Sequence, residues 1–199
     1  MSGFTAPLNS YSKKNLKSKI ALIDSDVFKY TVTHRMFKSL DSGIPYSKAL
    51  LISKIDEILN QEVFERFEAG AYLFCFSAPS SKVFRNSYAQ VKEYKGNRKN
   101  EVDKYYYDNK FEDMAEVYSY IQKRYMTLIF DDLEADDLLA MLQDLDATFI
   151  LSQDKDLKQV VGWHLDRETN SLTYTSEEDA IRMISFQMLT GDRAFICGR

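Results

Sequence analysis

The sequence predicts a single α/β domain with a mainly parallel central sheet flanked by helices. Four apolar runs have the length and composition of buried strands, at 19–23, 72–76, 127–130 and 148–151. Between the last two runs, apolar residues recur at roughly helical spacing, at Leu138, Leu139, Met141, Leu142 and Leu145. We therefore expect a strand–helix–strand unit over this part of the chain, and a connection of this kind joins parallel strands.

The other elements follow from local patterns along the chain. Helices are expected over 27–40 and 46–60, the second of them amphipathic. Two further strands are expected at 160–165 and 172–175. A last helix should begin at Ser176, because three acids fill the turn that follows it. Its apolar stripe is Ile181, Ile184, Met188 and Leu189.

Composition bounds the class of protein. A chain of 199 residues with 45% hydrophobic content suits one globular domain with a substantial core. Residues 1–18 are polar and carry scattered lysines, so we expect a flexible tail ahead of a domain over 19–199. The net charge of −4 is not that of a general nucleic-acid binder, so such a role needs a local basic patch.

Cysteine usage and hydropathy bear on location. The two cysteines are too few for a disulfide scaffold, and Cys75 lies in an apolar run where we expect a core residue. No apolar stretch approaches membrane-spanning length, and the N-terminus lacks the apolar core of a signal peptide. These features predict a cytoplasmic protein with no membrane partner.

Acidic residues follow the predicted strands at the points where the strands end. Asp24 follows the first run, and Asp154 and Asp156 follow the last. Five acids follow the third run, at Asp131, Asp132, Glu134, Asp136 and Asp137. The carboxyl ends of parallel strands share one edge of the sheet, where open α/β sheets keep their ligand sites. Two carboxylates about 4 Å apart repel by about 1 kcal/mol in water and about 4 kcal/mol at an intermediate effective dielectric constant. A rim holding several must protonate some, spread them apart or bind hard cations.

Helix capping is a simpler explanation for part of this pattern. Glu134, Asp136 and Asp137 fall in the first turn of an expected helix, where the helix dipole favours negative charge. Capping alone would account for one acidic cluster after one strand. A second cluster after 148–151, together with Asp24 after the first strand, favours a cation site.

A basic segment at 82–100 stands out in a chain that is acidic elsewhere. Its cations are Lys82, Arg85, Lys92, Lys95, Arg98 and Lys99, with Tyr88 and Tyr94 between them. Cations bind a phosphodiester backbone and aromatic rings stack on bases, so the segment suits nucleic acid. A solvated loop is the alternative that composition leaves open.

Several motifs follow one another in a fixed order between residues 19 and 192. They are Asp24, Phe84-Arg85, Tyr94-Lys95-Gly96-Asn97-Arg98, Glu134-Ala135-Asp136-Asp137, Asp154-Lys155-Asp156 and Gly191-Asp192. Together they resemble the 5′–3′ exonuclease and flap endonuclease family of phage or bacterial type, which has a PIN-like (resolvase-like) fold. The motif at 94–98 is the most specific of them. The resemblance implies a helical arch or clamp over about 95–125, and a bacterial or phage-infected host cell.

The resemblance also implies roles for individual residues. Ligands or near-ligands of a first metal ion would be Asp24, Glu134, Asp136 and Asp154, supported by Asp137. Asp156 and Asp192 would serve a second ion. Lys95 would contact the scissile phosphate and Arg98 would stabilise its charge, so the catalytic set is Lys95, Arg98, Asp24 and Asp136. The nucleic-acid-binding set is Arg85, Lys92, Tyr94, Lys95, Arg98 and Lys99.

Two Mg²⁺ ions (or Mn²⁺) are the implied cofactors, because two-metal sites hydrolyse phosphodiesters by in-line attack. Magnesium also takes few carboxylates and keeps waters that can react. The implied partner is DNA with 5′ ends, flaps or single strands. RNA is a second candidate, and a replication protein is a further implied partner.

The sequence departs from the family pattern in three places. Ser77-Ala78 occupies the position after the second strand where the family carries an acid. Phe195 stands where the family repeats an acid after its Gly-Asp pair. The family's helical duplex-binding region has no counterpart after Asp192, so we expect a short form. These departures thin the first metal shell and leave Asp192 without a partner.

Two other classes remain open on the sequence alone. One is a nucleic-acid-binding module of the same family that has lost its chemistry. The other is a haloacid-dehalogenase-like phosphohydrolase, in which Asp24 would be the nucleophile and Asp26 the general acid. That scheme gives no role to the motif at 94–98, and phosphate trapped covalently on Asp24 would favour it.

Overall fold

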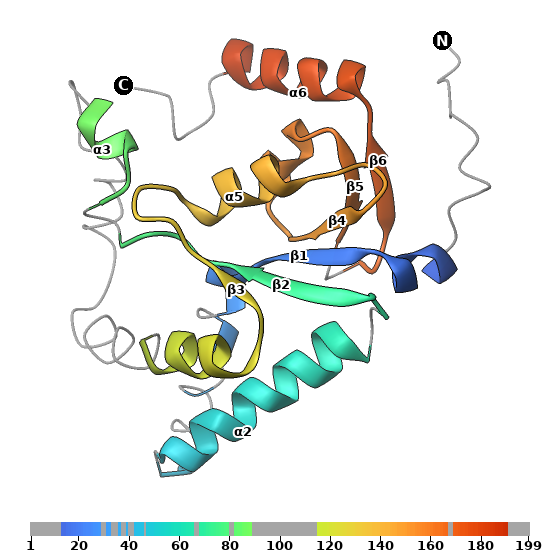
Figure 1. Ribbon diagram of the computed structural model, residues 1–199. Helices are drawn as coiled ribbons and strands as arrows, with labels where there is room; N and C mark the ends of the chain where they lie inside the picture. The colour runs from blue at the N-terminus through green and yellow to red at the C-terminus, as the bar shows by residue number, and fades with distance from the viewer. Residues whose placement is uncertain are drawn as a thin grey trace.

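The structure is a computed structural model. It describes residues 13–28, 31–32, 36, 39, 42–45, 47–65, 68–79, 82–88, 115–166 and 169–190. Within these residues the chain forms a six-stranded sheet with the strand order β3-β2-β1-β4-β5-β6 (Figure 1). The strands are β1 (Ile20–Asp24), β2 (Ala71–Cys75), β3 (Thr127–Leu128), β4 (Thr148–Leu151), β5 (Gly162–Leu165) and β6 (Leu172–Thr175).

The sheet is parallel except for its last strand. β1 pairs in parallel with β2 and β4, β3 with β2, and β5 with β4, whereas β6 runs antiparallel to β5. The connection from β3 to β4 contains α5 (Ala135–Leu142) and passes over β2 and β1, so the strands that it joins are not neighbours. Their carboxyl ends nevertheless lie at the same edge of the sheet. The predicted mainly parallel α/β fold is confirmed.

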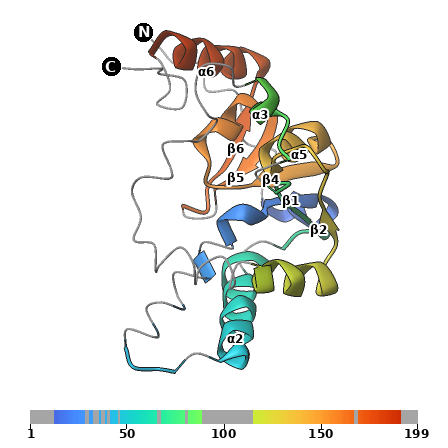
Figure 2. The same ribbon diagram turned by 90° about the vertical axis from the view of Figure 1, so that its left-hand side faces the viewer.

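Alternating side chains of the strands supply two hydrophobic clusters, one on each face of the sheet. Ala21 and Ile23 of β1 join the larger cluster, and Leu22 joins the smaller one, as the two-residue period of a strand requires. The larger cluster includes buried residues of α2 (Lys48–Leu59) and of the helical residues 115–124. The smaller cluster is covered by α5. Figures 1 and 2 show α2 and α5 on opposite sides of the sheet.

Helix α6 (Glu177–Thr190) begins where the sequence predicts. The Ser176 hydroxyl accepts a hydrogen bond from the Asp179 N–H at 3.2 Å. The predicted apolar stripe is wrong as a core face, because Ile181, Ile184, Met188 and Leu189 are 41–88% exposed. The helix turns another face inward, on which Ala180 is 4% exposed. On that face Gln187 Nε2 donates to Asp156 Oδ1 at 2.8 Å.

One predicted strand boundary and two predicted core residues differ from the structure. The strand expected over 127–130 ends at Leu128, and Phe130 is 50% exposed. Met141 and Leu145 do not face the core, since α5 buries Leu138 and Leu139 instead.

The predictions for the N-terminal tail and for Cys75 can be compared with the structure in part. The predicted tail over 1–18 includes a 3-10 helix, η2 (Lys13–Ser18), whose Leu16 is 4% exposed. Residues 1–12 lie outside the described part of the chain. Cys75 is buried as predicted, and burial raises the pKa of its thiol to about 12. No helix among the described residues is long and apolar enough to cross a membrane.

Candidate active site

Asp24 ends β1 at the carboxyl edge of the sheet and is 5% exposed. Its Oδ1 accepts from the Asp26 N–H at 3.2 Å, and its Oδ2 accepts from the Ser152 hydroxyl at 3.1 Å. Burial is the largest cause that raises the pKa of Asp24 to about 6, and the charge of Asp26 adds to it. The negative charge of Asp154 raises this pKa further. Asp24 is therefore held in place beside other acids.

Asp136 lies in the first turn of α5, above the same edge. Burial raises its pKa to about 7, and the charge of Asp24 is the next largest cause. The charges of Asp154 and Glu134 raise it as well. Acids from two other parts of the chain, Asp24 and Asp154, thus oppose the ionisation of Asp136. The structure therefore brings Asp24, Asp136 and Asp154 to the same edge of the sheet.

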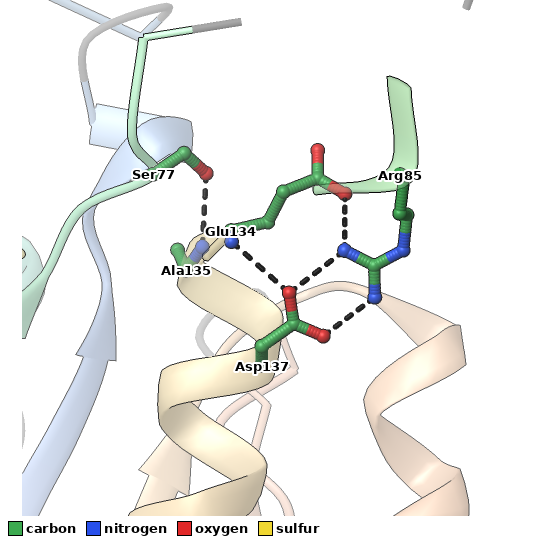
Figure 3. Close-up of polar contacts among 5 residues, drawn as sticks. All are labelled: Ser77, Arg85, Glu134, Ala135 and Asp137. Carbon is green, nitrogen blue, oxygen red and sulfur yellow. Dashed lines mark hydrogen bonds and ion pairs between the residues drawn. The ribbon is translucent and has the colours of Figure 1, made fainter. Parts of the chain in front are cut away.

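Glu134 and Asp137 form a capping box at the start of α5 (Figure 3). The Glu134 N–H donates to Asp137 Oδ2 at 3.0 Å. Both carboxylates also accept from Arg85, whose Nη1 lies 2.8 Å from Glu134 Oε2 and 2.7 Å from Asp137 Oδ2. Its Nη2 lies 2.5 Å from Asp137 Oδ1. The capping alternative therefore describes these two acids correctly, whereas Asp136 between them is the acid whose pKa the charges of Asp24 and Asp154 raise.

Ser77 and Ala78 take up the position where the family pattern has an acid. The Ser77 hydroxyl accepts from the Ala135 N–H at 2.9 Å, which holds the N-terminus of α5 against the end of β2 (Figure 3). Ala78 is 5% exposed, and its N–H donates to the Leu133 carbonyl at 2.8 Å. The segment after β2 therefore supports α5 and adds no charge to the rim.

Asp154 and Asp156 flank the start of η5 (Lys155–Gln159). Asp154 Oδ1 accepts from the Asp156 N–H at 2.9 Å, so Asp154 caps this short helix. The Asp154 N–H in turn donates to Ser152 Oγ at 3.0 Å. Ser152 thus bridges Asp24 and Asp154. Sequence reasoning missed Ser152, and its position two residues before Asp154, directly after β4, was the available signal.

The donor set of this rim consists of carboxylates and hydroxyls, which suits hard cations such as Mg²⁺ and Mn²⁺. Among the described residues, no three acidic, histidine or cysteine side chains already stand close enough to hold a metal ion. Glu134, Asp154 and Asp24 each accept hydrogen bonds from protein donors. The chemistry of these oxygen donors fits a hard cation.

The predicted nucleic-acid contacts fall almost wholly outside the described part of the chain. Lys92, Tyr94, Lys95, Arg98 and Lys99 lie there, and so does the predicted ligand Asp192. Arg85 belongs to α3 (Arg85–Tyr88) and is described. Its guanidinium contacts the site acids, a partnership that the sequence did not reveal.

The family model for the N-terminal resolvase-like domain of 5′–3′ exonucleases matches residues 19–190. The chain belongs to the 5′–3′ exonuclease family. This finding confirms the resemblance and the resolvase-like fold. The haloacid-dehalogenase alternative would have placed the chain in a different family. A search of curated proteins finds no match.

Solved structures of bacteriophage T5 proteins share the fold of this exonuclease-family chain. The T5 D15 protein co-crystallised with metal ions superposes with a TM-score of 0.61 at 18% identity. A T5 5′-exonuclease with bound zinc gives 0.61 at 17%, and a D15 flap endonuclease complex with DNA and metal ions gives 0.59 at 17%. Each match covers 89% of this chain and 68% of the T5 chain.

Proposed function

We propose that this exonuclease-family protein is a divalent-metal-dependent 5′–3′ exonuclease or flap endonuclease that hydrolyses phosphodiester bonds of DNA. The observation that carries the proposal is the convergence of Asp24, Asp136 and Asp154 at the carboxyl edge of the sheet. Burial, followed by the charges of Asp24 and Asp154, raises the pKa of Asp136 to about 7. Burial, followed by the charge of Asp26 and with a smaller effect of Asp154, raises the pKa of Asp24 to about 6. A pair of Mg²⁺ ions offsets such repulsion and serves phosphodiester hydrolysis.

The roles of the chain's residues follow from their positions. Asp24, Asp136 and Asp154 would hold the first cation, with Glu134 nearby. When bound, such ions lower the pKa of a water and stabilise charge on the leaving oxygen. Ser152 would orient Asp24 through its hydroxyl. Lys95 keeps the role that the family resemblance implies, at the scissile phosphate.

The T5 structures support the choice of substrate and cofactor class. Two of them contain metal ions, and a third is a flap endonuclease complex with DNA and metal ions. We extend both properties to this chain as part of the proposal.

Cleavage assays with defined substrates test the proposal. The purified chain is incubated with 5′-labelled flap, nicked and single-stranded DNA in Mg²⁺, Mn²⁺ or EDTA. We expect cleavage with either metal and none in EDTA. Asp154→Ala should abolish that cleavage while Asp131→Ala, on a fully exposed side chain at the same end of the sheet, should retain it. Cleavage that persists in EDTA, or in Asp154→Ala, would refute the proposal.

A DNA-binding module without catalysis is the second candidate. One observation favours it: Ser77 and Ala78 bring no carboxylate to the rim. The segment after β2 therefore adds no negative charge that a metal pair could use. Binding of flap DNA in EDTA, with no product in any metal, would support this candidate over the enzyme.

A further inference from the structure

We infer that Arg85 is a positioning residue, whose guanidinium fixes the carboxylates of Glu134 and Asp137 and thereby sets the affinity of the rim for a divalent cation. This inference rests on the proposed metal-dependent function and adds a residue to it. It assigns Arg85 a role different from the nucleic-acid contact that the basic segment predicts. The geometry around its side chain carries the inference.

The guanidinium is committed to two acids at once (Figure 3). It meets Asp137 with two nitrogens, at 2.7 and 2.5 Å, and its Nη1 also meets Glu134 at 2.8 Å. Such fork-like pairing with a carboxylate fixes orientation as well as distance. The side chains of Arg85, Glu134 and Asp137 are 32%, 11% and 20% exposed, so the contact is largely shielded from water. A guanidinium in this position has little freedom to reach a phosphate outside.

The pair is also joined to the frame of the site. Asp137 Oδ2, which accepts from Arg85, accepts from the Glu134 N–H as well. Ser77 holds the adjacent Ala135 N–H. The side-chain direction of Glu134, which is itself a predicted metal ligand, therefore depends on Arg85. A change at Arg85 therefore acts on a predicted ligand of the rim and on the start of α5.

Backbone and ring contacts also fix the start of the basic segment. The Phe84 N–H donates to the Asp132 carbonyl at 2.9 Å, and the Arg85 guanidinium lies 4.8 Å from the centre of the Phe84 ring. These contacts place Arg85 by backbone and ring as well as by charge. Arg85 therefore has the properties of a second layer around the metal ligands, where a substitution typically lowers metal affinity or activity by about 10–100-fold.

Two binding measurements on the full chain test the inference. Mn²⁺ affinity is measured by electron paramagnetic resonance, and affinity for a 5′-flap DNA is measured in EDTA. We expect Arg85→Gln to weaken Mn²⁺ binding about tenfold or more. The same variant should keep DNA affinity in EDTA within about twofold, the change expected of a residue that does not touch the DNA.

Matched variants separate charge from position. Lys82→Gln removes one positive charge from the same segment at an exposed side chain 3.9 Å from Asp131, and should leave Mn²⁺ affinity unchanged. Arg85→Lys keeps the charge without the fork and should restore only part of the affinity. Asp137→Asn should weaken Mn²⁺ binding from the other side of the pair. The double variant with Arg85→Gln should then be no worse than the stronger single variant, since the two residues act as one unit. Melting temperatures identify any variant that fails to fold, in which case Arg85→Lys and Asp137→Asn carry the test.

The outcomes are distinct. Weaker DNA binding by Arg85→Gln in EDTA with unchanged Mn²⁺ affinity overturns the inference in favour of a nucleic-acid contact. Unchanged values in both measurements, or equal losses in both, overturn it as well. If the wild-type protein binds Mn²⁺ but cleaves no DNA, the proposed nuclease function fails and the inference about Arg85 stands on the binding data. A wild-type protein that binds no Mn²⁺ overturns both.

Discussion

Replacing Asp136 with asparagine should stabilise the metal-free protein above neutral pH, even though Asp136 is a predicted catalytic residue. In the unfolded chain this carboxyl ionises above pH 3.8, whereas in the fold it stays protonated up to about pH 7. A raised folded-state pKa contributes stability that is fully present below the unfolded pKa and is lost as the pH rises through the folded one. Because one pKa unit corresponds to about 1.4 kcal/mol, ionised Asp136 costs the fold up to about 4 kcal/mol at pH 8. Asparagine has nearly the same size and cannot ionise.

Thermal unfolding in EDTA measures this effect. For a domain of this size 1 kcal/mol shifts the melting temperature by about 2–4 °C, so Asp136→Asn should melt several degrees above the wild type at pH 8. The gap should narrow at pH 5, where the wild-type carboxyl is protonated in the fold. Asp131→Asn is the control. The Asp131 side chain is fully exposed, so this substitution should change the melting temperature little. An Asp136→Asn protein that melts at or below the wild-type temperature at pH 8 would refute the reasoning.

Three further substitutions test other parts of the site. Ser152→Ala removes the hydroxyl that lowers the pKa of Asp24, so this pKa should rise above about 6 in a titration followed by nuclear magnetic resonance. An unchanged titration would mean that the hydrogen bond is absent in solution. Ser77→Ala leaves the Ala135 N–H without its acceptor. In a urea titration the variant should lose about 0.5–2 kcal/mol of unfolding free energy, as the loss of a helix cap does, and no loss would show that α5 does not depend on this contact. Lys95→Ala should slow DNA cleavage far more than it weakens DNA binding, and equal losses in the two assays would count against its assigned contact with the scissile phosphate.

The positions of the principal acids could be predicted because they depend on short-range patterns. A buried run that ends in Asp24, and another that ends before Asp154, place both acids at the ends of strands. The helical crossover predicts that the strands at 127–130 and 148–151 are parallel, with their carboxyl ends at one edge. The structure adds the first strand to that edge, because β1 pairs in parallel with β4. Asp136 follows in the same way from the start of α5. The family motifs then indicated what such an edge is for.

The partners of these acids could not be predicted, because they depend on contacts between distant parts of the chain. Arg85 lies 49 residues before Glu134 along the sequence, and nothing in a basic segment shows which of its cations turns inward. Ser77 seemed to be a missing ligand, whereas the structure shows it as the acceptor that supports α5.

The predicted buried face of helix α6 was wrong for a related reason. Its apolar spacing is regular, yet the face that packs on η5 is fixed by Ala180 and by the bond from Gln187 to Asp156, which periodicity does not reveal. Spacing along one helix predicts that a face exists, and only the neighbouring elements decide which face is buried.

A Mn²⁺ titration of the wild-type protein at pH 8, followed by electron paramagnetic resonance, tests the central claim most directly. If Asp24, Asp136 and Asp154 form a cation site, the protein should bind Mn²⁺, Mg²⁺ should displace it, and Asp136→Asn should weaken the binding strongly. Wild-type and Asp136→Asn proteins that give the same titration as buffer alone would contradict the account.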